Sequence, residues 1–226
     1  MPAPEGEPII TLHYIDRPPY AISDGNNKPS GVVAAPTELA FKKAKIPFVW
    51  AKTPVNRQFA IIKENRGLDC AVGLEQTPSR SEFGKFSTPL YVGKPLIAII
   101  NLKVKEKAGV TLAELLKKYT ILVKENYTQG TEITEMINAS KNKHVTAVES
   151  VQMVQMVAQG HGDFMMISKE EVDYYIQHGI LDAKSVRVLE LPDVQKRFLR
   201  RIMCSKAVDD KVITKLDKAI EQMGVF

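Results

Sequence analysis

The sequence is poor in cysteine and aromatic residues, and it has no long apolar segment. It contains two cysteines and one tryptophan among 226 residues, and aromatic residues make up 7%. No apolar run approaches the roughly 20 residues that a membrane-spanning helix needs, so no direct membrane insertion is expected. Hydrophobic residues at 44% and charged residues at 25% are ordinary for a globular protein.

The cysteines and histidines do not form the patterns of metal or catalytic sites. No CxxC, P-loop, GxSxG or HExxH motif occurs. The sequence therefore predicts no metal, no cofactor and no catalytic residue. Cys70 and Cys204 lie in apolar segments, so buried thiols are expected, with a bridge between them as the alternative in an oxidising compartment.

Charge and length restrict the class of protein further. The net charge is +5 and the isoelectric point about 9.0, but the lysines are scattered, so nucleic-acid binding is not predicted. The densest basic cluster, "KRFLRR" at 196–201, is expected to be a solvated strand edge or a hinge. The length suits two lobes of roughly 100 residues each.

The N-terminal "MPAPEGEP" has neither the charged nor the apolar region of a signal peptide. We therefore expect no signal peptide in this chain and a flexible tail over residues 1–7. Composition alone leaves open a cytoplasmic protein and a mature exported chain.

Hydrophobic patterning predicts an α/β fold with two lobes, each a mostly parallel sheet flanked by helices. The chain up to residue 75 follows a β-α-β-α-β order, and crossovers of this length imply parallel strands. A second α/β series begins at residue 95, and the last strand and helix could return to the first lobe. Strands are expected at 8–15, 46–52, 68–74, 95–101, 119–125, 144–149, 163–168 and 200–206, and helices at 36–45, 56–67, 111–118, 131–140, 150–162, 169–179 and 209–223.

Several helix ends carry recognisable signals. Asn56 is expected to be an N-cap, with Gly67 closing the same helix. Thr111 and Glu114 have the spacing of a capping box. The helix at 36–45 is expected to have an acidic first turn.

Open α/β sheets bind ligands beyond the carboxyl ends of their strands. Arg80 follows one such end and could clamp a carboxylate, because a guanidinium presents paired donors; a surface arginine is the alternative. Arg17, held by the following prolines, is either a second anion donor or a loop residue.

Other polar residues at strand ends are weaker candidates. Tyr14, Tyr20 and Tyr127 could pack on a ligand or be half-buried core residues. Glu75 could bind an amine or be a solvated carboxylate. Backbone amides at the start of the helix within 128–137 could hold an anion or be ordinarily capped.

Taken together, the segments "IDRPPY", "KPSG", "GLDCAVG", "TPSR", "FSTPLY" and "AQGHGDFMMIS" resemble the bacterial extracytoplasmic solute-binding proteins of family 3, the amino-acid-binding components of ABC importers. The likeness covers residues 8–223. It implies the type II periplasmic-binding-protein fold, with lobe 1 formed by 8–94 and 196–226, lobe 2 by 95–195, and hinge strands near 92–96 and 191–200.

The resemblance implies which residues bind the ligand. The arginine of the family's T-x-x-R motif grips the ligand's α-carboxylate, and here that motif supplies Thr77 and Arg80. Gly73 and Glu75 stand where the family has small hydroxyl residues. In the second lobe, Tyr127 and Thr128 compete with Gly130 and Thr131 for one role.

The same comparison reveals departures. Tyr14 and Ser168 occupy positions that are usually acidic, and Arg17 occupies the usual aromatic position. Two ammonium partners are therefore missing and an arginine is gained. Either Glu75 or Glu170 replaces the lost partner, or the ligand is not a standard α-amino acid.

The implied function is capture of a small carboxylate-bearing solute between two lobes and its delivery to the membrane permease of an ABC transporter. Such a protein would be periplasmic, monomeric and without chemistry of its own. The alternatives are a cyclohexadienyl dehydratase-like enzyme on the same fold, with Glu75 or Glu170 as acid or base, and the ligand-sensing module of a signalling system.

Overall fold

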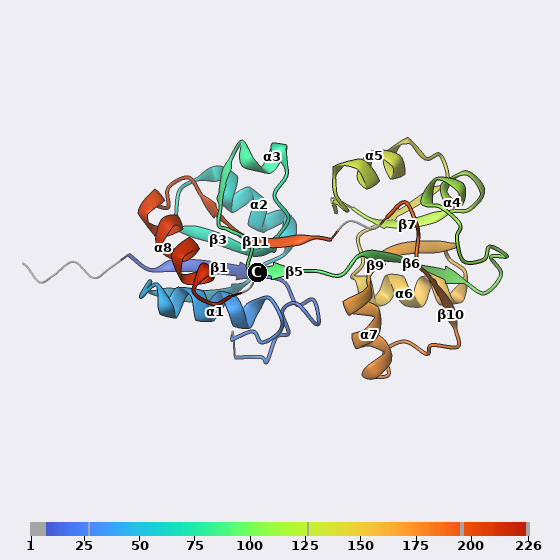
Figure 1. The fold of residues 1–226 in the computed structure, drawn as a ribbon, viewed down its shortest axis with the longest axis horizontal. Coiled ribbons are helices and arrows are strands. Elements are labelled where there is room, and N and C mark those ends of the chain that lie inside the picture. Colours follow the sequence, from blue (N-terminus) through green and yellow to red (C-terminus); the bar gives the residue numbers. More distant parts are fainter. Residues whose placement is uncertain (1–7, 27, 126, 195–196, 225–226) are drawn as a thin grey trace, which may run out of the picture. The chain divides into compact units, whose positions relative to one another are not determined.

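A computed structural model of the protein consists of two compact α/β units (Figure 1). It describes residues 8–26, 28–125, 127–194 and 197–224. Unit 1 takes the described chain up to Val92 and from Leu199 onward, and unit 2 runs from Gly93 to Phe198. The predicted tail at 1–7 and residues 126 and 196 lie outside the described residues.

Unit 1 is built on a mixed sheet with the strand order β2-β1-β3-β11-β4, and β5 pairs with β11. β1 is parallel to β2 and β3, whereas β11 is antiparallel to β3, β4 and β5. The predicted parallel pairing therefore holds for the N-terminal strands only. The strands are β1 (Ile10–Tyr14), β2 (Phe48–Lys52), β3 (Asp69–Leu74), β4 (Gly84–Phe86), β5 (Tyr91–Val92) and β11 (Leu199–Ser205).

Helices cover both faces of this sheet because the strand side chains alternate between two apolar clusters. Leu12 and Cys70 pack in one cluster with α1 and α8, while Ala71 and Met203 pack in another with α2. Figure 1 shows α1 and α2 on opposite sides of the sheet. The helices are α1 (Ala34–Lys43), α2 (Val55–Glu64), α3 (Pro78–Ser81) and α8 (Asp210–Glu221).

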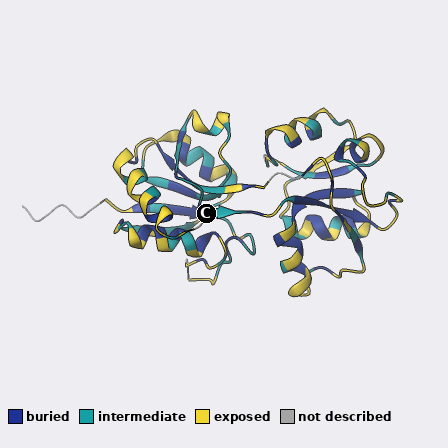
Figure 2. Cartoon of the chain, in the orientation of Figure 1, coloured by how far each residue is buried: buried dark blue, intermediate teal, exposed yellow. Residues whose placement is uncertain are grey.

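Unit 2 repeats this layered design around a sheet of order β10-β6-β9-β7-β8. β7 is parallel to β8 and β9, and β6 is antiparallel to β9 and β10. Every residue of β6 is buried, as expected for a strand covered on both faces (Figure 2). The strands are β6 (Leu96–Asn101), β7 (Ile121–Lys124), β8 (Lys143–Thr146), β9 (Phe164–Ser168) and β10 (Val186–Leu189).

Two pairs of helices enclose the sheet of unit 2. The apolar cluster containing Ala98 and Met166 is completed by α4 and α5, and the cluster containing Ile99 and Met165 by α6 and α7. Adjacent residues of one strand thus belong to different clusters, as the period of two requires. The helices are α4 (Leu112–Lys118), α5 (Thr131–Ala139), α6 (Ser150–Gln159) and α7 (Lys169–Gln177).

The expectation of free thiols is wrong, because Cys70 and Cys204 form a disulfide. They are direct partners in the antiparallel register of β3 and β11, and both side chains are fully buried. The two residues are far apart in the sequence, so only the pairing of these strands brings the thiols together.

Some predicted helix ends also need correction. α2 begins after Pro54 without a side-chain cap, and Asn65, in the left-handed conformation, ends it in place of Gly67. The first turn of α1 has no acidic residue, because the helix begins at Ala34, earlier than predicted. The capping box of Thr111 and Glu114 is confirmed. Within the described residues, no helix combines the length and apolarity needed to cross a membrane.

Candidate functional site

The strongest candidate residues of unit 1 lie just after β1 and β3. Near the end of β3, Gly73 has a φ of 75°, in the region that favours glycine. A Cβ at this position would lie 3.0 Å from Cγ1 of Val33. Glycine at 73 therefore satisfies both the backbone conformation and the close approach of α1's N-terminal end.

Arg80 is fixed by its own loop. The hydroxyl of Thr77 accepts a hydrogen bond from the Arg80 N–H at 3.3 Å and caps α3. Nη1 of Arg80 donates to the carbonyl oxygen of Glu75 at 2.9 Å, and the guanidinium carbon lies 4.7 Å from the ring centroid of Phe59. The "TPSR" motif thus produces a half-buried arginine with a defined orientation.

Two further arginines converge on Tyr20, whose side chain is buried. The guanidinium carbons of Arg17 and Arg200 lie 5.2 and 5.0 Å from the centroid of this ring, within the range of cation–π attraction. The ring of Tyr91 meets Tyr20 edge-on at 6.2 Å.

Arg200 connects this cluster to the β3 end, because its Nη1 donates to the carbonyl oxygen of Gly73 at 3.4 Å. The sequence placed Arg200 only within a basic strand edge or hinge. No local motif identifies it as a site residue, since its partners are far away in the sequence. We use the name arginine cluster of unit 1 for Arg17, Arg80 and Arg200, which follow β1, follow β3 and lie in β11 beside the end of β3, respectively.

Tyr14 lies in the core of unit 1. Its side chain is 1% exposed, its ring meets Trp50 edge-on at 5.8 Å, and its hydroxyl lies 3.4 Å from that of Ser23. This burial fits the core alternative for Tyr14, and its contact with a ligand stays a prediction.

In unit 2, Ser168 caps helix α7. Its hydroxyl accepts from the N–H of Glu171 at 3.3 Å and donates to the carboxylate of Glu171 at 2.8 Å. Glu170 is also buried, and its Oε1 accepts from the N–H of Lys94 at 2.5 Å. These three polar groups are tied to the backbone or to one another within unit 2.

The loop before α5 places the remaining candidates of unit 2. Tyr127 is half-buried, with Nζ of Lys124 at 5.0 Å from its ring centroid. Thr128 is exposed. Gly130, with a φ of 85°, is the N-cap residue of α5. No cluster of potential metal ligands occurs among the described residues.

Comparison by sequence identifies no relative. No protein-family model matches the chain, and a search of curated proteins finds no match.

Solved structures with the same fold do match. A histidine kinase sensor domain with similarity to periplasmic binding proteins superposes with a TM-score of 0.78 at 15% identity, over 96% of this chain and 90% of that chain. The arginine-, lysine- and histidine-binding protein ArtJ from Geobacillus stearothermophilus gives 0.76 at 15% identity, over 96% and 89%. An ancestral amino acid-binding protein described as a precursor of cyclohexadienyl dehydratase gives 0.71 at 16% identity, over 96% and 89%.

These matches confirm the predicted two-lobed periplasmic-binding-protein fold. At such identities they show the shared fold and not a shared ligand or activity.

Proposed function

We propose that this protein captures a small carboxylate-bearing solute through the arginine cluster of unit 1 and delivers it to the permease of an ABC transporter. The observation that carries the proposal is the guanidinium of Arg80, which is fixed by its hydrogen bond to the carbonyl oxygen of Glu75. Arg200 donates to the carbonyl oxygen of Gly73, two residues earlier in the chain. Guanidinium groups match the geometry of carboxylates and remain charged at any working pH.

The disulfide of Cys70 and Cys204 supports an extracytoplasmic compartment. Structural disulfides persist in oxidising compartments and are rare in the cytosol. This favours an extracytoplasmic protein, of the two alternatives that composition left open.

The ligand is expected to be an organic acid rather than a standard amino acid. Tyr14 is in the core, and Ser168 is engaged in capping α7. Neither is an acidic residue that could neutralise an ammonium group, and an uncompensated buried ammonium costs several kcal/mol. Of the two acidic alternatives, Glu170 accepts a hydrogen bond from the N–H of Lys94 in unit 2, so an amino acid would depend on Glu75 for its counter-charge. A cluster of arginines instead favours a ligand with more negative than positive charge.

A thermal-shift screen of matched pairs tests this class of ligand. Each small mono- or dicarboxylate is compared with its uncharged amide. At about 100 times its dissociation constant, a specific acid should raise the melting temperature by roughly 5–10 °C, and its amide should not. If amides stabilise the protein as well as the acids do, recognition does not depend on a carboxylate and the proposal fails.

A sensor role is the second candidate, favoured by the likeness to a histidine kinase sensor domain. Uptake of the radiolabelled ligand by cells with and without the gene separates the two roles. Loss of uptake is expected for an importer component, whereas normal uptake with a lost transcriptional response identifies a sensor. The dehydratase alternative predicts consumption of prephenate or arogenate, which we do not expect.

A further inference from the structure

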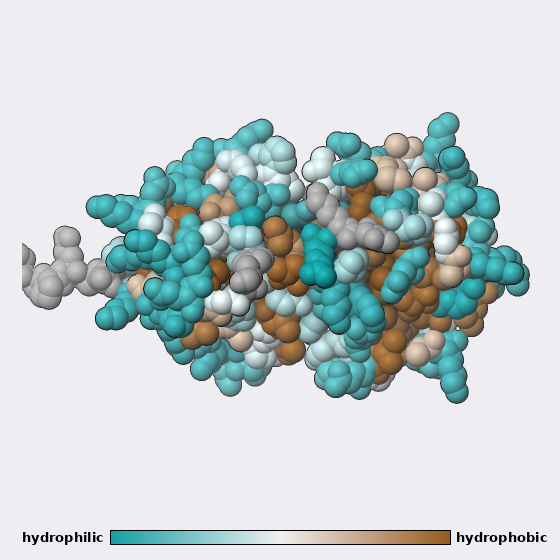
Figure 3. Space-filling view, viewed as in Figure 1, coloured by the Kyte–Doolittle hydropathy of each residue, from teal (hydrophilic) through white to brown (hydrophobic). Residues whose placement is uncertain are grey.

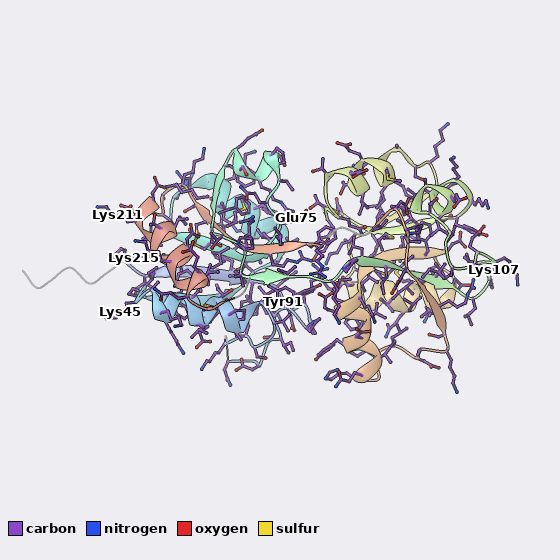
Figure 4. The ribbon with its side chains drawn as sticks, viewed as in Figure 1. Lys45, Glu75, Tyr91, Lys107, Lys211 and Lys215 are labelled. Carbon is purple, nitrogen blue, oxygen red and sulfur yellow. A yellow bond between two sulfur atoms is a disulfide. The ribbon has the colours of Figure 1, made fainter. Side chains whose placement is uncertain are left out.

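Unit 1 has a cavity at the edge of its sheet opposite to the arginine cluster, where the strands begin. Its volume is about 330 Å³, and it lies among the starts of β1, β2 and β3 and the N-terminal end of α8. In Figure 4, Lys45, Lys211 and Lys215 lie at this end of unit 1, and Glu75 and Tyr91 lie at the other. The cavity is therefore distinct from the site described above.

The inner wall of the cavity is apolar. Ile10, Ile46 and Val208 are at most 8% exposed and belong to the core, and Leu68 and Val212 pack against them. The core of unit 1 thus opens to the surface at this edge. A ligand with an apolar body would remove this surface from water, which is favourable in proportion to the area covered.

The rim of the cavity is predominantly basic. Lys45 and Lys215 line it from exposed positions, and Figure 3 shows hydrophilic side chains over this end of the unit. Asp209 also lines the cavity, but its carboxylate accepts a hydrogen bond from the N–H of Lys211 at 2.8 Å and caps α8. The rim thus offers two ammonium groups to an anion.

Lys45 occupies an unusual backbone conformation. Its φ of 54° is left-handed, and Lys45 and Asn65 are the non-glycine residues with a positive φ among those described. This conformation ends α1, because the N–H of Lys45 donates to the carbonyl oxygen of Lys42 and the N–H of Ile46 donates to that of Phe41. The helix end thus places Lys45 at the rim of the cavity.

We propose that this cavity binds an amphipathic monocarboxylate, with the apolar body inside and the carboxylate at Lys45 and Lys215. One water takes about 30 Å³ of liquid, so the cavity suits a body of on the order of ten non-hydrogen atoms. Octanoate has this size and charge. Acetate lacks the apolar body, and 1-octanol lacks the charge.

Titration calorimetry with octanoate tests the proposal on the whole chain. Octanoate should bind at a single site and acetate should not. The double variant Lys45→Gln/Lys215→Gln should weaken octanoate binding by about fivefold, since exposed ion pairs contribute modestly, and should leave 1-octanol binding unchanged. Lys218→Gln, which removes an exposed charge elsewhere on α8, is the matched control and should change neither.

Two further measurements locate the bound molecule. Methyl resonances of Val208 and Val212 should shift on adding octanoate, and they should shift equally in Arg80→Ala. Lys45→Gly should remain as stable as the wild type, because glycine suits a positive φ, but bind octanoate more weakly. The proposal is overturned if octanoate does not bind, if the double variant behaves like Lys218→Gln, or if Arg80→Ala abolishes the methyl shifts.

Discussion

Cys70 of β3 and Cys204 of β11 stand directly opposite each other and are joined by a disulfide, with Cα atoms 3.9 Å apart and a sequence separation of 134. All of unit 2 lies between them in the sequence. The bond therefore joins the two chain segments that together build unit 1.

Removing this disulfide should destabilise the protein substantially. For Cys70→Ala/Cys204→Ala we expect the free energy of unfolding to fall by about 2–5 kcal/mol, because the bond restricts a long loop in the unfolded chain. Urea unfolding followed by circular dichroism measures the change. A reductant present during unfolding should lower the free energy of unfolding of the wild type towards that of the variant. It should leave the free energy of unfolding of the variant unchanged. An unchanged urea midpoint in the variant would contradict the structural role of the bond.

Arg80→Ala should abolish binding of a carboxylate ligand identified by the thermal-shift screen. Truncating one partner of a buried, hydrogen-bonded charge pair costs about 2–5 kcal/mol of binding free energy. Arg80→Lys should recover only part of this, because an ammonium lacks the bidentate geometry. Arg66→Ala, an exposed arginine of the same unit, is the calorimetric control. Equal affinities for Arg80→Ala and Arg66→Ala would exclude the clamp.

Gly73→Ala should disturb both stability and binding. The left-handed φ costs an alanine about 1–2 kcal/mol, and the new Cβ would press on Val33. Gly25 has a similar φ of 83°, and a Cβ added there would meet no atom within 4 Å. Gly25→Ala is therefore the matched control for the conformational cost alone.

We expect Gly73→Ala to unfold at lower urea concentration than Gly25→Ala. Only Gly73→Ala should weaken ligand binding, since Arg200 donates to the Gly73 carbonyl group. Indistinguishable affinities in the two variants would mean that the β3 end does not position the site.

Ser168→Ala should destabilise unit 2 by removing the cap of α7. Loss of a serine N-cap costs about 0.5–2 kcal/mol, and Glu171, which is fully buried, also loses a hydrogen-bond donor. Asp209→Ala removes the exposed cap of α8. In thermal unfolding, it should lose less stability than Ser168→Ala. A smaller loss in Ser168→Ala than in Asp209→Ala would contradict this account.

The separate prediction that Ser168 contacts the ligand is tested on the same variant. Reduced affinity for the identified ligand would support the contact, and unchanged affinity would limit Ser168 to its capping role.

The capping box of α4 should make stability depend on pH in the acid range. Hydrogen bonds from the backbone and hydroxyl of Thr111 hold the pKa of Glu114 below its usual value of 4.5. A lowered carboxyl pKa means that the stabilisation is complete above the usual value and is lost as the pH falls through the folded-state pKa.

Thermal unfolding between pH 7 and pH 3 should therefore lose less stability in Glu114→Gln than in the wild type. Glu135→Gln, an exposed carboxyl group on α5, is the control and should follow the wild type. If the stability of Glu114→Gln depended on pH as that of the wild type does, the capping box would not contribute to the pH dependence.

Local signals predicted most helices and strands, and failed where pairing comes from distant segments. β4 is a short strand between a helix and a proline turn, and β10 alternates with a charged residue. Both are stabilised by partners that arrive from elsewhere: β11 pairs with β4, and β6 with β10. For this reason β4 and β10 were not predicted as strands, although their partners β11 and β6 were, and the antiparallel pairing was not predicted either.

The candidate site divides in the same way. The "TPSR" motif drew attention to Thr77 and Arg80, and the cap that Thr77 forms on α3 connects the two over only three residues. The approach of Arg200 to Gly73 spans 127 residues, and no spacing rule detects a contact of that range. The lysine-rimmed cavity is likewise assembled from segments that meet only through the sheet.

The sequence by itself determined most of the alternation of helices and strands and the capping box of Thr111 and Glu114, because these depend on periodicity and on hydrogen bonds between near neighbours. Only the tertiary structure decided that the two cysteines bond, that Arg17 and Arg200 share Tyr20, and that Tyr14 belongs to the core. The physical reason is that burial of apolar surface drives the return of β11 to the first sheet. Such burial is not directional, so it specifies no partner residue until the whole unit has formed.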